Sequence, residues 1–193
     1  SAMAARYRFR IVTTAGELTS ADLAQPLIGV FSEETLAVRW QGTDGRTAEA
    51  TETGWLHNLS DYLGDTKEPD VMDCEPNPEY GDTPSLALMT ETALEQLSSD
   101  NDQGFFLMIE SASIDKQSHK RDPCGSIGEI AQLEEALDLA QTFANKHPDT
   151  LIIVTADHAQ AAQILPEPTL YSRYPIPIYS PGLTARINTP EGG

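Results

Sequence analysis

Two short apolar segments, each followed closely by residues that can bind metal ions, constrain the fold more than any other feature of this chain. Residues 104–110 read GFFLMIE, and residues 150–155 read TLIIVT. Uninterrupted apolar runs of this length are typical of strands buried on both faces of a parallel sheet. Between them, apolar residues recur at helical spacing: Ile130, Leu133, Leu137, Ala140 and Ala144. We therefore predict a strand–helix–strand unit with parallel pairing, within an α/β fold whose central sheet is covered by helices.

Local signals predict the helix starts and the less regular regions. Ser126 and Glu129 form the pattern of a capping box at the start of the long helix, and Thr83-Pro84 predicts the start of an earlier helix. Residues 41–80 are polar and rich in Gly, Pro, Asp and Thr, which predicts a surface excursion with one helix near residues 55–63. No internal repeat divides the chain, so we expect residues 1–193 to belong to a single domain.

The chain is strongly acidic, with 30 acidic residues, 12 basic residues and a formal net charge of −18. This charge disfavours nucleic-acid binding, and it would repel anionic substrates unless bound cations reversed the local field. Adaptation of the surface to solubility or salt explains the same charge without any function. No apolar run approaches the roughly 20 residues of a membrane-spanning helix. The first residues lack a signal-peptide pattern, and Ser1-Ala2-Met3 reads as an expression scar before a chosen start, so we expect a longer parent protein.

Metal-capable side chains follow both apolar segments, at the strand ends where open α/β sheets bind ligands. Glu110 ends the first segment. Asp115 and His119 come next, four residues apart, so one helical face can present both to a single ion. Asp157 and His158 follow the second segment side by side. Mixed carboxylate and imidazole ligation suits zinc, and an all-oxygen site around Glu110 suits magnesium.

Each of these residues also has an ordinary structural interpretation. Glu110 alone is consistent with a loop or helix cap. Asp115 and His119 are consistent with an exposed ion pair. Asp157 and His158 are consistent with turn residues that satisfy backbone groups. Their joint placement favours a metal site, because all five follow two segments that we expect to be neighbours in the sheet.

Two other histidines and both cysteines lie outside this pattern. His147 falls near a predicted helix C-terminus, where a cationic side chain is ordinary, and His57 falls in the polar region without an identifiable partner. Neither Cys74 nor Cys124 belongs to a CxxC pair, which disfavours zinc–thiolate chemistry. Composition leaves both a disulfide and two buried thiols open for them.

The sequence resembles bacterial alkaline phosphatases over most of its length, weakly in residues 41–72 and beyond residue 166. The segments that carry the resemblance are 104–119 (GFFLMIESASIDKQSH), 122–129 (DPCGSIGE), 150–158 (TLIIVTADH), 74–78, 26–31 and 38–40. The resemblance implies a three-layer αβα fold with a central, largely parallel sheet sandwiched by helices. It also implies that this chain forms only a partial domain, with the core of the metal site in residues 104–158.

The resemblance implies two zinc ions. Asp115 and His119 resemble ligands of a first zinc, which binds the ester oxygen and activates the attacking water. Asp157 and His158 resemble ligands of a second zinc, which activates a serine nucleophile. The implied reaction is phosphoryl transfer to that serine, followed by hydrolysis of the phosphoserine.

The resemblance also implies a magnesium site, a phosphate contact and a disulfide. Glu110 resembles a magnesium ligand, and Lys116 resembles a residue that contacts the phosphate or its water. Cys74 and Cys124 resemble a disulfide of the family. Such a bond implies an oxidising compartment, and hence a periplasmic or secreted protein.

The chain departs from the family pattern where the nucleophile is concerned. The family serine lies in an Asp-Ser-Ala motif, and no Asp-Ser dipeptide occurs among the 193 residues. Gln160 stands where some relatives have a histidine near the second zinc. Ser111, Ser113 and Thr155 lie near the site, but packing or hydrogen bonding is the simpler role for each. We therefore expect this chain to be inactive alone.

The resemblance implies that the parent protein is a phosphomonoesterase, a hydrolase acting on small phosphate monoesters as a homodimer. One alternative is another member of the same metalloenzyme superfamily, such as a phosphodiesterase or a sulfatase. A second alternative is a non-catalytic metal-binding module.

Overall fold

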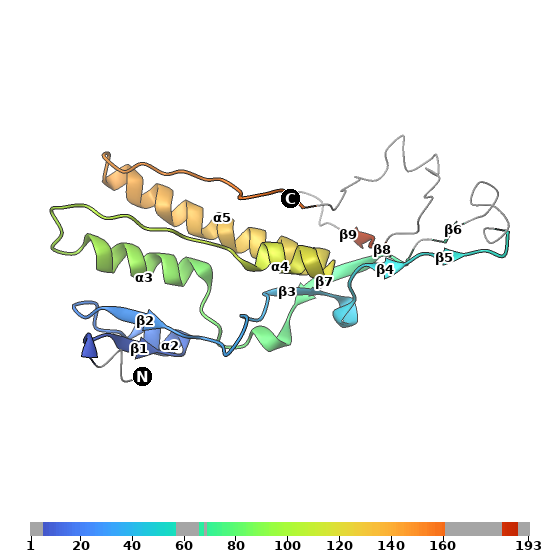
Figure 1. Cartoon of the computed structure of the whole chain (residues 1–193), viewed down its shortest axis with the longest axis horizontal. Helices are drawn as coiled ribbons and strands as arrows, with labels where there is room; N and C mark the ends of the chain where they lie inside the picture. The colour runs from blue at the N-terminus through green and yellow to red at the C-terminus, as the bar shows by residue number, and fades with distance from the viewer. Residues whose placement is uncertain (1–5, 57–65, 68, 161–182, 189–193) are drawn as a thin grey trace.

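The computed structural model describes residues 6–56, 66–67, 69–160 and 183–188, and within these residues the fold combines helices with several small sheets. Figure 1 shows the long helix α5 lying beside α3 and α4, with the short strands of the middle region at one end of these helices. The predicted α/β content is therefore present. The sheets are smaller than the central sheet that we predicted.

The N-terminal unit is a parallel strand pair connected by a short helix. Strand β1 (Arg10–Val12) pairs with β2 (Leu27–Gly29), and α2 (Ala15–Thr19) lies between them in sequence. Thr14 caps α2, because its hydroxyl accepts a hydrogen bond from the backbone N–H of Glu17 at 3.1 Å. The Glu17 carboxylate in turn accepts the backbone N–H of Thr13, and this bond lowers the pKa of Glu17.

Most strand pairs in the described residues include at least one strand from the region that we predicted to be a polar surface excursion. Strand β3 (Trp40–Gly42) pairs antiparallel with β7 (Met72–Pro76), which pairs in parallel with β9 (Ile187–Asn188). The remaining pairs are β4 (Glu49–Ala50) with β8 (Leu183–Thr184), and β5 (Glu52–Thr53) with β6 (Thr66–Lys67). The sequence interpretation did not predict the strands of this region, which form because backbone groups pair into sheets even where side chains are polar. The helix predicted near 55–63 lies mostly outside the described residues.

Three longer helices form the body of the described chain: α3 (Leu86–Ser98), α4 (Ser113–Lys120) and α5 (Pro123–Lys146). Our predicted start of α5 at Ser126 was wrong. Asp122 is the N-cap, with its carboxylate accepting the N–H of Gly125 at 2.9 Å, and Pro123 takes the first helical position. The predicted start of α3 at Thr83-Pro84 was also displaced, because the hydroxyl of Ser85 caps this helix.

The buried face of α5 differs from the apolar stripe that we predicted. Ile130 and Leu137 are exposed, whereas Gly128, Glu129 and Gln132 are buried. Gly128 lies against β3, where an added Cβ would come within 3.0 Å of the Trp40 side chain. A small residue at this position therefore lets α5 approach the sheet closely, and the buried face of α5 combines small residues with the polar side chains of Glu129 and Gln132.

The two apolar segments predicted as parallel strands are not strands in this structure. Neither residues 104–110 nor residues 150–155 pair with another segment in the part of the chain that the structure describes. Four of their side chains are strongly exposed: Phe106 (87%), Met108 (77%), Leu151 (80%) and Ile153 (76%). A strand assignment needs a hydrogen-bonded neighbour, and the described residues provide none at these segments.

A disulfide between Cys74 and Cys124 joins β7 to the first turn of α5. This bond confirms the pairing that the family resemblance implied. It ties the sheet of the middle region to the helices that carry the candidate site. No helix in the described ranges has both the length and the apolar character needed to cross a membrane.

Candidate metal centre

Helix α4 presents two of the predicted metal ligands on one face. Asp115 lies in its first turn and His119 in its last, one helical turn apart, as the spacing in the sequence predicted. The Nε2 atom of His119 lies 3.5 Å from Oδ1 of Asp115. Both side chains are substantially exposed, so they are accessible to an ion from solvent.

One member of the second predicted ligand pair, His158, reaches the same carboxylate. The Nε2 atom of His158 lies 3.6 Å from Oδ1 of Asp115 and 3.6 Å from Oδ2 of Asp157. The backbone N–H of His158 also donates to Oδ1 of Asp157 at 3.0 Å, which orients that carboxylate toward the imidazole. Asp115, His119, Asp157 and His158 are therefore brought together from two segments separated by the whole of α5.

The orientation of His158 fits a cation between these side chains. Its Nδ1 atom lies 3.1 Å from the backbone oxygen of Ala159, which can only accept, so this contact is a hydrogen bond when Nδ1 carries the proton. Nε2 of the neutral ring then directs its lone pair toward the carboxylates of Asp115 and Asp157. A bound cation would be attracted by all three groups, and a mixed set of imidazoles and carboxylates suits zinc.

Gln160 makes a further contact with this cluster. Its side-chain amide donates a hydrogen bond to Oδ1 of Asp115, the atom nearest both imidazoles. The contact joins α4 directly to the segment that carries Asp157 and His158. In this arrangement the amide N–H of Gln160 places a partial positive charge beside the Asp115 carboxylate, which otherwise faces two imidazole nitrogens.

Glu110 and Lys116 lie apart from the four-residue cluster, around a cavity of about 200 Å³. Both line this cavity, together with Ser111, Ser113 and residues of α5. The cavity therefore places a carboxylate and an ammonium group along one hollow beside the start of α4. Among the residues that the structure describes, no hydrogen bond or ion pair joins Glu110 to another residue.

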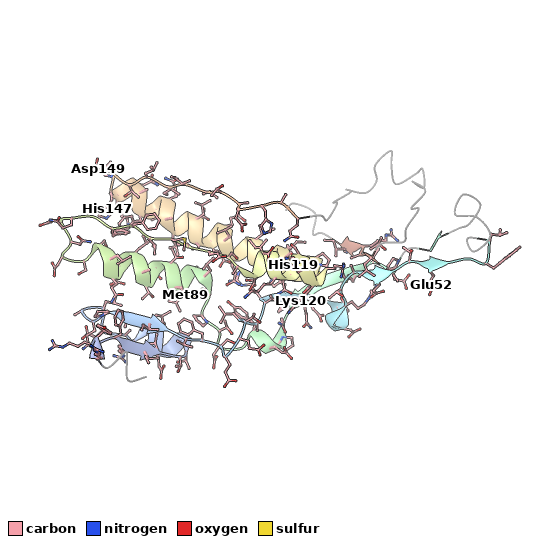
Figure 2. The ribbon with its side chains drawn as sticks, in the orientation of Figure 1. Glu52, Met89, His119, Lys120, His147 and Asp149 are labelled. Atoms are coloured by element: carbon pink, nitrogen blue, oxygen red, sulfur yellow. A yellow bond between two sulfur atoms is a disulfide. The ribbon has the colours of Figure 1, made fainter. Side chains whose placement is uncertain are left out.

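Of the two histidines that the sequence analysis placed outside the metal-binding pattern, the structure describes only His147, which is not part of the cluster. His147 stacks on Phe143 at 4.2 Å between ring centroids, and Figure 2 places it at the opposite end of α5 from His119. His57 lies outside the described residues. As it stands, the described part of the chain contains no group of three or more His, Cys, Asp or Glu side chains arranged to enclose a metal ion. The cluster thus supplies suitable donors without a closed coordination shell.

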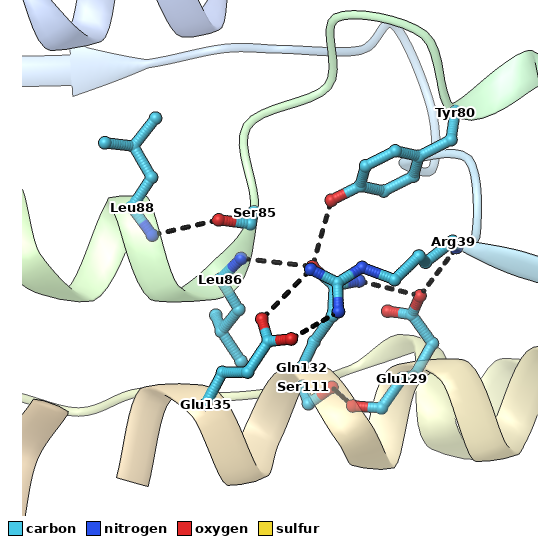
Figure 3. A network of polar contacts seen from close by, with 9 residues as sticks. All are labelled: Arg39, Tyr80, Ser85, Leu86, Leu88, Ser111, Glu129, Gln132 and Glu135. Carbon is cyan, nitrogen blue, oxygen red and sulfur yellow. Dashed lines mark hydrogen bonds and ion pairs between the residues drawn. The ribbon is translucent and has the colours of Figure 1, made fainter. Parts of the chain in front are cut away.

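Our sequence interpretation missed a buried polar network next to this site, shown in Figure 3. Glu129 and Gln132 are only 7% and 4% exposed, and they hydrogen-bond to the segments of Arg39 and Tyr80. We had assigned Glu129 to a capping box. No sequence signal marked this pair, because the apolar stripe predicted for the helix included neither residue and pointed to a different buried face.

Two ionisable groups of the network have shifted pKa values. Burial raises the pKa of the Tyr80 hydroxyl above its ordinary value. Hydrogen bonds to the Glu135 carboxylate raise the pKa of the Arg39 guanidinium, which donates through both terminal nitrogens at 2.6 and 3.0 Å. Tyr80 is therefore a neutral donor and Arg39 a cation at ordinary pH.

Comparison with known proteins identifies related sequences. A family model described as alkaline phosphatase matches residues 3–180. The chain is 42% identical over 188 residues to alkaline phosphatase of Escherichia coli (strain K12) and to alkaline phosphatase H of Pseudomonas aeruginosa (strain UCBPP-PA14), covering 95% of this chain and 34% of each relative. It is 34% identical over 191 residues to streptomycin-6-phosphate phosphatase of Streptomyces griseus, covering 96% of this chain and 37% of that relative. The chain thus spans about a third of the length of these curated relatives.

Proposed function

This chain belongs to the alkaline phosphatase family, and from that premise we propose that the intact protein hydrolyses small phosphate monoesters. The observation that carries the proposal is the approach of two imidazoles to one carboxylate oxygen, from His119 and His158 to Asp115. The relatives named above are phosphatases, which favours a phosphate ester as substrate over a sulfate ester. A phosphodiesterase within the same superfamily is the main competing activity.

The side chains of this chain would have distinct roles. Asp115 and His119 would hold one zinc ion, and Asp157 and His158 a second. Glu110 would contribute to a magnesium site. When bound, these ions would supply Lewis-acid activation of oxygen at the phosphorus centre. The Lys116 ammonium, which lines the same cavity as Glu110, would bind the phosphate or a water beside it.

The serine nucleophile would come from polypeptide outside these 193 residues. This part of the proposal rests on the absence of an Asp-Ser dipeptide from the sequence and on the share of the relatives that the chain spans. Each zinc would then have only two ligands from this chain. We infer that the chain alone binds zinc weakly and is inactive.

The compartment, the oligomeric state and the partners of the intact protein are part of the same proposal. The disulfide between Cys74 and Cys124 favours an oxidising compartment, so we propose a periplasmic or secreted protein. We propose a homodimer, which is usual for the family that the sequence resembles. The net charge of −18 supports the expectation that nucleic acid is not a partner.

Hydrolysis of a chromogenic phosphate monoester tests the proposed function. The assay compares the 193-residue chain with a protein extended to the length of the relatives, both supplied with zinc and magnesium. We expect no turnover by the chain and turnover by the extended protein, with much slower cleavage of a matched phosphodiester and of a sulfate ester. Faster cleavage of the diester or the sulfate by the extended protein would replace the monoesterase assignment.

A matched pair of variants ties this activity to the cluster. Asp115→Asn removes the charge at the shared carboxylate, and Asp138→Asn removes an exposed charge from α5. We expect the first substitution to abolish turnover of the extended protein and the second to leave it nearly unchanged. Equal activity in the two variants would contradict a metal site at Asp115.

A further inference from the structure

Two buried side chains of α5 join three segments that are distant in sequence (Figure 3). Oε1 of Glu129 accepts the backbone N–H of Arg39 at 3.1 Å and the side-chain amide of Gln132 at 2.9 Å. Oε1 of Gln132 accepts the hydroxyl of Tyr80 at 3.0 Å and the backbone N–H of Leu86 at 3.2 Å. Two acceptor atoms on one turn of α5 therefore satisfy four donors, one from α5 itself and three from the chain around β3, η2 (Pro78–Tyr80) and the start of α3.

The same turn of α5 also holds the segment that leads into the candidate metal centre. The hydroxyl of Ser111 donates to the backbone oxygen of Glu129 at 3.1 Å. Ser111 follows Glu110 directly and precedes the first turn of α4, which carries Asp115 and Lys116. Glu110 and Lys116 line the same cavity as Tyr80, Glu129 and Gln132. The network thus lines one part of that cavity, and Glu110 and Lys116 line another part.

We propose that Glu129 and Gln132 are positioning residues, which hold the start of α4 at a fixed place on α5 and so place Asp115 and Lys116. The inference rests on the proposed function, because the place of these two side chains matters only if they bind metal and phosphate. Neither Glu129 nor Gln132 touches the four-residue cluster. Both influence the site indirectly, through the turn of α5 that binds Ser111 and through the residues that line the cavity.

Because hydrogen bonds require defined distances and angles, this network constrains the positions of the bonded segments more than an apolar contact would. Loss of the Glu129 carboxylate removes the acceptor of the part-buried N–H of Arg39 and of the buried amide of Gln132, and unsatisfied buried donors are costly. The surrounding segments would then shift to reach water or other partners. Such a shift would move the turn of α5 whose backbone holds Ser111, and with it the start of α4.

The first test measures position without any metal. Amide hydrogen exchange across residues 110–116 is compared between the wild-type chain and the variants Glu129→Leu and Glu129→Gln. Gln keeps an acceptor oxygen at the place of Oε1, whereas Leu removes it. We expect Glu129→Leu to accelerate exchange in this segment about tenfold and Glu129→Gln to restore rates close to those of the wild type. Unchanged exchange in Glu129→Leu would overturn the inference.

The second test measures the consequence for metal binding in the protein extended to the length of the relatives, with Co²⁺ as a spectroscopic probe that replaces zinc. We expect Glu129→Leu to weaken Co²⁺ binding about tenfold, in the range found when groups that support metal ligands are removed, and Glu129→Gln to rescue it. Ala136→Gly is the matched control. It weakens α5 at another buried position through lower helix propensity, outside the network.

The two tests separate failure of the network from failure of the proposed function. Equal loss of Co²⁺ binding in Ala136→Gly and Glu129→Leu would assign the effect to general instability and overturn a positioning role. Faster exchange in Glu129→Leu, with no Co²⁺ binding even by the wild-type protein extended to the length of the relatives, would support the positioning role of the network. The same result would contradict the proposed metal site.

Discussion

Asp115 illustrates how a single side chain can connect segments that are far apart in the sequence. It lies 3.5 and 3.6 Å from the imidazoles of His119 and His158, and it accepts a hydrogen bond from Gln160. Its spacing from His119 follows directly from helical periodicity. Its approach to His158 depends on the path of the chain after α5, and no local pattern specifies that path.

Tyr80 offers a test of the buried network through pH. Burial raises the pKa of its hydroxyl, so the folded state retains a proton that the unfolded chain loses near its ordinary pKa of about 10. The associated stability is complete below that value and is lost as the pH rises through the higher pKa of the folded state. We expect the wild type to lose more stability than Tyr80→Phe between pH 9 and pH 11. Urea unfolding of both proteins across this range measures the difference.

Tyr80→Phe also removes the hydrogen bond to Gln132, which is worth about 1 kcal/mol at neutral pH. The variant is therefore the less stable protein at pH 8, and the gap should narrow as the solution becomes more alkaline. The other tyrosines titrate in both proteins and cancel in the comparison. A gap that stayed constant or widened up to pH 11 would mean that the folded state does not raise the pKa of Tyr80.

At the scale of secondary structure elements, α5 is the helix on which the other parts of the described chain assemble. It contacts α3, α4 and β3, and it carries both the disulfide and the polar network. Its start at Pro123 follows an abrupt turn in which Arg121 adopts a left-handed conformation with φ of 59°. The relative placement of α4 and α5 therefore depends on this short junction.

The N-cap of α5 provides a prediction at this scale. Asp122→Ala removes the acceptor for the N–H of Gly125 and should lower the free energy of unfolding by about 1–2 kcal/mol. Asp122→Asn keeps an acceptor oxygen and should lose much less. Chemical denaturation of the two variants beside the wild type measures both effects. If Asp122→Asn lowered the free energy of unfolding as much as Asp122→Ala, the stabilisation would come from the charge of Asp122 rather than from its hydrogen bond to Gly125.

For the whole molecule, the disulfide is the strongest link between the middle sheets and the helices. The Cys74–Cys124 bond closes a loop with a sequence separation of 50, for which loop entropy predicts a contribution of about 4 kcal/mol. We expect the double variant Cys74→Ala/Cys124→Ala to be less stable by an amount of this order. Urea unfolding with and without a reductant measures it. The reductant should not change the stability of the double variant. If it also left the stability of the wild type unchanged, the predicted contribution of the disulfide would be refuted.

The exposed apolar segments make a second prediction for the whole molecule. Phe106, Met108, Leu151 and Ile153 expose more apolar surface than single scattered residues would, and such surfaces promote association. We expect the isolated chain to self-associate as its concentration rises, as measured by sedimentation velocity. Phe106→Lys should reduce this association. Val71→Lys, which changes an exposed apolar residue elsewhere, should not. A monomeric wild type at all concentrations would contradict the prediction.

The sequence alone determined the features that depend on near neighbours and on recognisable motifs. Asp115 and His119 lie on one helical face because four residues make about one turn, and the family motifs identified Glu110, Asp157 and His158 as further candidates. The pairing of Cys74 with Cys124 was likewise implied by the family resemblance and is present in the structure. The ligand roles of these candidates stay predictions.

Only the tertiary structure decided which residues are concealed and which segments meet. Local patterns placed apolar residues on the buried face of α5, yet Glu129 and Gln132 are buried and Ile130 is exposed. They also predicted strands at residues 104–110 and 150–155, which lack hydrogen-bonded neighbours in the described chain. Burial and strand pairing depend on the position of other segments in space, and a periodic pattern in one segment carries no information about those positions.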